Sequence, residues 1–207
     1  MKDNKTKKIV MWAVTLAVIF VAFMLDKALS SWNIVSGALC ALFVTFTFCY
    51  LDNSWSSGIV AFVFMGLMSI VKELIMPGLN YEIAVNPLVA ILPRLIAGTL
   101  AFSTYRLMLL LTKKAKNKRT RQVVCIDVAT LIGLLANTVC YLSAIVIYEN
   151  VVVGASNGLF ALIKTLVVAN IVPEYLASLI GVPMVVLGVR RGLKLGLDGN
   201  NWKKVEE

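Results

Sequence analysis

Six long blocks of apolar residues follow one another along the chain, separated by shorter segments where charged and polar residues gather. Each block is long enough for a helix that crosses a hydrocarbon core of about 30 Å, which takes about 17 to 25 residues. The blocks lack the strict apolar and polar alternation of a membrane β-strand, and helices satisfy their own backbone polar groups in lipid. We predict an all-α integral membrane protein with six spans: Ile9–Leu25, Asn33–Tyr50, Gly58–Met76, Leu88–Leu111, Val123–Tyr148 and Gly158–Val189.

Basic residues concentrate in three of the connecting segments. The run "MKDNKTKK" precedes the first block, "KKAKNKRTR" follows the fourth and "RRGLK" follows the sixth. Six crossings place all three on one side, so the positive-inside rule predicts that both termini are cytoplasmic. The expected organisation is a basic N-terminus over residues 1–8, a six-helix substrate-binding membrane domain over residues 9–191 and a polar cytoplasmic tail over residues 192–207.

Composition agrees with a multi-pass protein of the plasma membrane. Hydrophobic residues make up 59% of the chain and the mean hydropathy is +0.86, values that soluble domains rarely reach. The formal charge of +9 flanks the predicted spans, so we expect it to anchor the protein in the membrane and not to bind nucleic acid. The first block resembles a signal peptide, but its apolar run is long and no small-x-small cleavage site precedes Asp26, so we expect it to be retained.

Several enzyme classes are excluded by residues that the sequence lacks. It has no histidine for a catalytic triad or an HExxH zinc site, and no GxxxxGK[ST] phosphate loop. The four cysteines, Cys40, Cys49, Cys125 and Cys140, lie inside predicted spans without CxxC spacing, which is typical of inert packing residues. We therefore expect no catalytic residue, metal or cofactor, and any nucleotide hydrolysis must take place on another chain.

Charged side chains inside the predicted spans require an explanation, because each costs on the order of 3 kcal/mol at the bilayer centre. The predicted topology places Lys72, Glu73, Arg94 and Lys164 at similar depth in the outer leaflet. Polar residues of the neighbouring loop and of one face of the fifth span lie at the same end. We predict an outward-facing substrate pocket formed by Glu73, Tyr81, Asn86, Arg94, Asn137, Tyr141 and Lys164.

Arg94 has two interpretations. In the structural one it extends to the headgroups or pairs with Glu73; in the functional one it contacts a ligand. The flanking Pro87 and Pro93 are expected to distort the start of the helix and to aim the guanidinium into a water-accessible pocket. Similar structural alternatives hold for Lys72 at the headgroups and for Asn137 in helix packing.

Two further patterns occur in the first and last spans. Ala13 and Ala17 form a small-xxx-small face that allows another helix to approach closely. In "NIVPEYLAS", Pro173 predicts a kink and Glu174 is a carboxylate deep enough to need a partner or a proton.

Three stretches, "NPLVAILPRLIAG", "ANTVCYL" and "VVANIVPEYLASLIGVPMVVLGVRR", together resemble the substrate-binding S component of energy-coupling factor (ECF) vitamin transporters. The resemblance covers roughly residues 58–191. It implies a six-helix subunit that captures a vitamin from outside and associates with a membrane scaffold subunit and two ATPases. Ala13 and Ala17 match the AxxxA face by which such subunits contact the scaffold, and Arg94, Asn137 and Lys164 fall in the outer half where the family binds its substrate.

The expected ligand follows from the charges near the pocket. Lys72, Arg94 and Lys164 outnumber Glu73 and Glu82 by one charge, which favours an anionic vitamin such as pantothenate. Because "DKALSSWN" lacks the proline-rich connection of relatives that bind riboflavin or folate, the substrate cannot be copied from them.

Other ligands and another class of function stay open. Cobalamin is one alternative ligand, and hydroxymethylpyrimidine or pyridoxine stacked on Tyr81 and Trp32 is another. The alternative function is an autonomous secondary carrier for a small polar solute. Such a carrier usually shows inverted repeats or a chain of membrane carboxylates.

Overall fold

The computed structural model describes the protein's backbone in six stretches, and every regular element in them is helical. Side chains are described for most of these residues but not for residues 159–173. No strand occurs in these stretches, so the predicted all-α class is confirmed for them. The described stretches are residues 2–31, 39–51, 54–77, 81–115, 117–148 and 159–192.

Six long or medium helices follow the predicted order, and the four-residue helix α4 was not predicted. The first helix begins at Lys2, well before the predicted span, because the polar start of the chain continues the same helix into water. The elements are α1 (Lys2–Ser31), α2 (Leu39–Leu51), α3 (Trp55–Ile75), α4 (Tyr81–Ala84), α5 (Pro87–Leu111), α6 (Lys118–Tyr148) and α7 (Leu159–Gly192).

Five described stretches are long and apolar enough to cross a membrane; four match predicted spans closely, and the fifth, Glu174–Gly192, overlaps the second half of the last predicted span. The second predicted span, Asn33–Tyr50, is described only from Leu39. Its helix α2 has 13 residues, which reach about 20 Å at 1.5 Å per residue, less than a hydrocarbon core of about 30 Å. Helices able to span a membrane are therefore present, and the count of six crossings stays a prediction. The five stretches are Ile9–Leu29, Gly58–Ile75, Pro87–Leu111, Lys118–Tyr148 and Glu174–Gly192.

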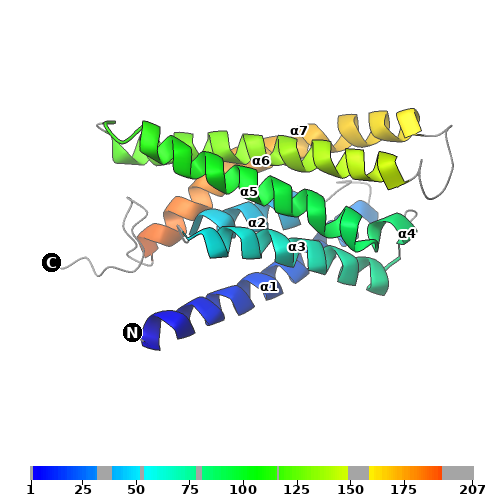
Figure 1. The fold of residues 1–207 in the computed structure, drawn as a ribbon, viewed down its shortest axis with the longest axis horizontal. Coiled ribbons are helices and arrows are strands. Elements are labelled where there is room, and N and C mark those ends of the chain that lie inside the picture. Colours follow the sequence, from blue (N-terminus) through cyan, green and yellow to red (C-terminus); the bar gives the residue numbers. More distant parts are fainter. Residues whose placement is uncertain are drawn as a thin grey trace.

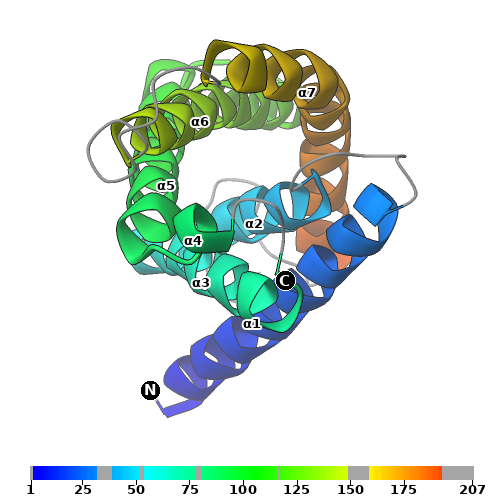
Figure 2. The same cartoon turned by 90° about the vertical axis from the view of Figure 1, so that its right-hand side faces the viewer.

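The helices run lengthwise and form a closed ring. Figure 1 shows the start of α1, the turn from α5 to α6 and the end of α7 at one end of the bundle, and α4 at the other. We call these the basic end and the α4 end, because the first holds exposed basic residues such as Lys118 and Arg191. Viewed end-on, contacts close the ring in the order α2, α3, α5, α6 and α7, and α1 packs outside against α2 and α3 (Figure 2).

Aromatic rings fill the centre of the ring of helices. Phe46 meets Phe62 edge to face with ring centroids 5.1 Å apart. Two glycines let these rings reach the facing backbones: a Cβ atom at Gly98 would lie 2.4 Å from the Phe62 ring, and one at Gly133 would lie 2.6 Å from the Phe46 ring. The outer faces are apolar and exposed, as lipid contact requires.

Candidate functional site

Arg94 is a buried cation near the α4 end, with 8% of its surface exposed. Its Nη1 donates to the carbonyls of Val89 at 3.2 Å and Ala90 at 2.5 Å. Its Nη2 donates to the hydroxyl of Ser69 at 3.3 Å, and the guanidinium carbon lies 5.0 Å from the centroid of the Tyr141 ring. The side chain therefore points back toward the start of its own helix, as helical geometry favours.

Pro93 explains one of these hydrogen bonds. Proline has no N–H, so the carbonyl four residues earlier, that of Val89, loses its helical donor. The Nη1 atom of Arg94 supplies a donor to this carbonyl. Since an unsatisfied carbonyl is costly in an apolar medium, Pro93 and Arg94 act as one local unit in which the arginine compensates for the proline.

Two buried polar atoms beside this unit have no hydrogen-bond partner within the described part of the chain. They are Nε of Arg94, a donor on α5, and Oδ1 of Asn137, an acceptor on α6. Asn137 lies one helical turn from Tyr141, whose ring contacts the guanidinium. The hydroxyl of Tyr175 on α7 also lacks a well-aligned partner and lies close to Thr138. A polar ligand in this region would find both donors and acceptors unoccupied.

Asp26 of α1 is a buried carboxylate whose role the sequence did not reveal. It is 2% exposed and accepts hydrogen bonds from the backbone N–H groups of Cys40 at 2.8 Å and Ala41 at 2.9 Å. It thus caps the described start of α2 from another helix and places a negative charge at the positive end of the α2 dipole. In the sequence, the only indication of this role is that Asp26 is a single acidic residue directly after an apolar block.

Charges of both signs surround Lys72 on α3. Its Nζ lies 2.5 Å from a carboxylate oxygen of Glu73 and 5.8 Å from the centroid of the Phe23 ring. Asp26 is within electrostatic range of Lys72, and Glu174 of α7 is close enough to Asp26 for the two carboxylates to repel each other. The predicted partner of Arg94, Glu73, therefore forms its ion pair with Lys72.

These side chains come from five helices, and we call them the polar belt. Ser69 connects the two halves, because it lies one helical turn from Lys72 and Glu73 and also accepts from Arg94. The polar belt consists of Asp26, Ser69, Lys72, Glu73, Arg94, Asn137, Tyr141, Glu174 and Tyr175.

The remaining predicted site residues lie elsewhere or outside the description. The side chain of Asn86 accepts a hydrogen bond from the backbone N–H of Leu88 at 3.0 Å, so it caps α5 together with Pro87. Tyr81 is exposed on α4. Lys164 and Trp32 lie outside the described side chains, and their roles stay predictions.

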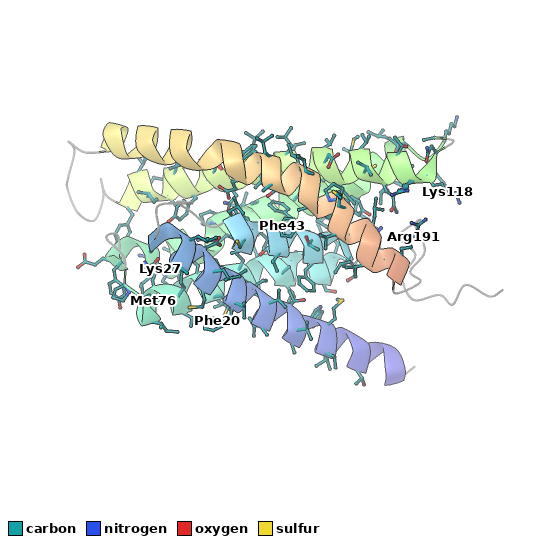
Figure 3. The ribbon with its side chains drawn as sticks, turned by 180° about the vertical axis from the view of Figure 1, so that it is seen from behind. Phe20, Lys27, Phe43, Met76, Lys118 and Arg191 are labelled. Atoms are coloured by element: carbon teal, nitrogen blue, oxygen red, sulfur yellow. The ribbon has the colours of Figure 1, made fainter. Side chains whose placement is uncertain are left out.

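Ala13 and Ala17 are exposed on the outer face of α1. The opposite face of this helix buries Ile19 and Phe23 in the core. Figure 3 shows α1 along the outside of the bundle, with Phe20 and Lys27 labelled on it. The small-residue face therefore points away from the described part of the chain, toward lipid or another protein.

Comparison with known proteins does not assign this arrangement to a family. The chain matches no family model, no curated protein and no solved structure. Function must therefore be inferred from the polar belt and from the helices that position it.

Proposed function

We propose that the protein is the substrate-binding S component of an ATP-driven ECF transporter and that its polar belt captures a small vitamin-like solute. The observation that carries the proposal is the pair of unpartnered buried atoms, Nε of Arg94 and Oδ1 of Asn137, on the adjacent helices α5 and α6. A buried polar group without a partner costs about 1–3 kcal/mol, which a ligand with complementary groups would recover.

The expected orientation supports capture from outside. Exposed lysines and arginines gather at the basic end, which the positive-inside rule assigns to the cytoplasm. Asp26 near the end of α1 and Arg94 near the start of α5 place the polar belt toward the α4 end, whose helix ends Figure 1 shows together, so it belongs to the outer half of the membrane in this orientation. We propose six crossings of the plasma membrane with both termini cytoplasmic, in which α2 belongs to a crossing that begins before Leu39.

The exposed face around Ala13 and Ala17 supports a partner for α1. Small residues let a second helix approach closely in lipid, where packing drives helix association. We propose that this face contacts a membrane scaffold subunit and that two ATPase subunits supply the energy, because the chain has no GxxxxGK[ST] loop of its own.

The described charges refine the ligand class. The polar belt holds three carboxylates, Asp26, Glu73 and Glu174, against the cations Lys72 and Arg94. The excess of positive charge expected from the sequence thus depends on Lys164. We propose a small vitamin with one acceptor or anionic group for Arg94 and several hydroxyl or amide donors for the carboxylates. Pantothenate has this pattern, and pyridoxine, hydroxymethylpyrimidine and cobalamin are the alternatives.

The test combines ligand identification with uptake. We expect mass spectrometry of the detergent-purified protein to reveal a co-purified vitamin, and calorimetric titration to show tight binding of that compound alone among the four candidates. Uptake into vesicles should require the scaffold and ATPase subunits. Absence of binding to any vitamin would refute the proposal.

The three carboxylates of the polar belt favour one alternative, a proton-coupled secondary carrier. Such a carrier would transport its solute without any ATPase subunit. Uptake that persists without ATPases and stops when a protonophore removes the proton gradient would establish the carrier and exclude the S component.

A further inference from the structure

A second buried polar cluster lies toward the basic end of the bundle. Its members come from four helices of the ring, and each is at most 2% exposed. Tyr105 is eleven residues from Arg94 on α5, about 16 Å along the helix axis, and Thr130 is seven residues from Asn137 on α6, about 10 Å. We call this the inner cluster, and it consists of Tyr50, Tyr105, Gln122, Thr130 and Arg190.

Arg190 supplies the charge of the inner cluster. Its Nη2 donates to the carbonyl of Tyr50 near the end of α2, where the helix dipole is negative. The hydroxyl of Tyr105 is within electrostatic range of the guanidinium. Nη1 has no hydrogen-bond partner, and no carboxylate pairs with Arg190 among the described residues. A buried guanidinium without a counter-charge is strongly unfavourable, so an anion bound beside Nη1 would stabilise it.

The other members present further unoccupied polar atoms. Within the described stretches, the hydroxyls of Tyr50, Tyr105 and Thr130 and both amide atoms of Gln122 have no well-aligned partner. The Tyr50 and Tyr105 rings lie 5.0 Å apart, and Thr130 is close to the Tyr50 hydroxyl. Gln122 lies eight residues before Thr130 on α6, about 12 Å along the helix axis. Native proteins leave few buried polar groups unpaired, and here four side chains besides Arg190 do so within one cluster.

We propose that the inner cluster binds a small oxyanion, a carboxylate or phosphate group, between α2, α5, α6 and α7. Arg190 provides the charge. The hydroxyls of Tyr50, Tyr105 and Thr130 and the Gln122 amide N–H can donate further hydrogen bonds, which an oxyanion can accept. Exposed basic residues at the same end, including Lys118 and Arg191 labelled in Figure 3, raise the local concentration of anions. The site shares no residue with the polar belt and does not depend on the proposed vitamin capture.

The test uses two adjacent arginines that differ in burial. In detergent at constant ionic strength, the melting temperature of the wild-type protein should rise saturably with phosphate and not with chloride. Arg190→Gln should abolish this rise, whereas Arg191→Gln, with the same loss of charge at an exposed position, should keep it. Tyr105→Phe removes one hydroxyl and should weaken phosphate binding roughly tenfold or more. If Arg190→Gln does not fold, the same measurement is made on Arg190→Lys and Tyr105→Phe instead.

Reconstitution distinguishes a free anion from a lipid headgroup. Native mass spectrometry of protein from phosphatidylcholine nanodiscs with and without phosphatidylglycerol should show whether one anionic lipid is retained and whether Arg190→Gln releases it. Retention assigns the site to a headgroup phosphate, and stabilisation by phosphate without lipid assigns it to a free anion. The proposal is overturned if neither phosphate nor anionic lipid binds, which would mean buried water only. It is also overturned if Arg191→Gln has the same effect as Arg190→Gln.

Discussion

Replacing Arg94 by alanine, alone and together with Pro93→Ala, separates a structural role of the guanidinium from a role in ligand binding. Arg94→Ala removes the Nη1 donor to the Val89 carbonyl. That carbonyl has no helical donor of its own, because the residue four positions later is Pro93, which lacks an N–H. The unsatisfied acceptor costs about 1–3 kcal/mol of folding free energy. Loss of the contact with the Tyr141 ring adds about 0.5–2 kcal/mol.

Pro93→Ala restores a backbone N–H that can donate to Val89 in the ordinary helical pattern. It also removes the intrinsic penalty of proline in a helix, about 3 kcal/mol, in either background. The informative quantity is therefore the difference: Pro93→Ala should stabilise the Arg94→Ala protein by about 1–3 kcal/mol more than it stabilises the wild-type protein. Unfolding in mixed micelles with increasing denaturing detergent measures the four free energies. Equal stabilisation in both backgrounds would refute the structural role.

In this set of variants, the double variant should regain stability without regaining ligand affinity. Losing a charge-assisted hydrogen bond costs about 1.5–3 kcal/mol, so the double variant should bind its vitamin roughly tenfold to more than a hundredfold more weakly. Arg94→Lys should lose part of the affinity, because it keeps the charge without the planar fork. Calorimetric titration of the double variant gives the answer. Wild-type affinity in that well-folded protein would eliminate Arg94 as a ligand contact.

Three other perturbations test separate parts of the structure. Ala13→Trp or Ala17→Trp should leave vitamin binding intact and abolish uptake in vesicles, and normal uptake would exclude this face from coupling. Asp26→Asn should lower the unfolding free energy by about 1–2 kcal/mol, because the amide is uncharged and its single oxygen replaces the two carboxylate oxygens that accept from Cys40 and Ala41; an unchanged value would contradict the cap. Gly133→Ala should destabilise by about 1–3 kcal/mol as its Cβ meets the Phe46 ring, whereas the matched Gly188→Ala, with open space around it, should be neutral or stabilising by up to about 1 kcal/mol.

The helices could be predicted because block length and apolar composition are properties of consecutive residues. Five predicted spans coincide with helices that can cross a membrane, and the burial of Arg94 follows its position in such a block. The four-residue helix α4 could not be predicted, since so short an element carries no periodic signal.

The partners of the charged residues could not be predicted, because they are set by contacts between helices. Asp26 was considered only as the end of an apolar run, yet it holds the start of α2. The "RR" of the last basic run predicted two anchoring charges, whereas Arg190 is buried and only Arg191 is exposed. Neighbours in sequence thus differ in burial because consecutive helical residues face directions about 100° apart.

The cap that Asp26 provides to α2 means that α1 contacts both the surface and the interior of the protein, so a change at its exposed face can be transmitted to α2. One face of α1 is open to a partner, and the same helix holds the start of α2 through two hydrogen bonds beside Lys72 and Glu174. A partner that shifts α1 must either move α2 together with α1 or break the two hydrogen bonds of the cap. In the second case the Asp26 carboxylate would lose its partners in α2 while staying beside Lys72 and Glu174. Since linkage is reciprocal, a ligand of the polar belt that changed the preferred position of α1 would change the affinity of this face for a partner by the same factor.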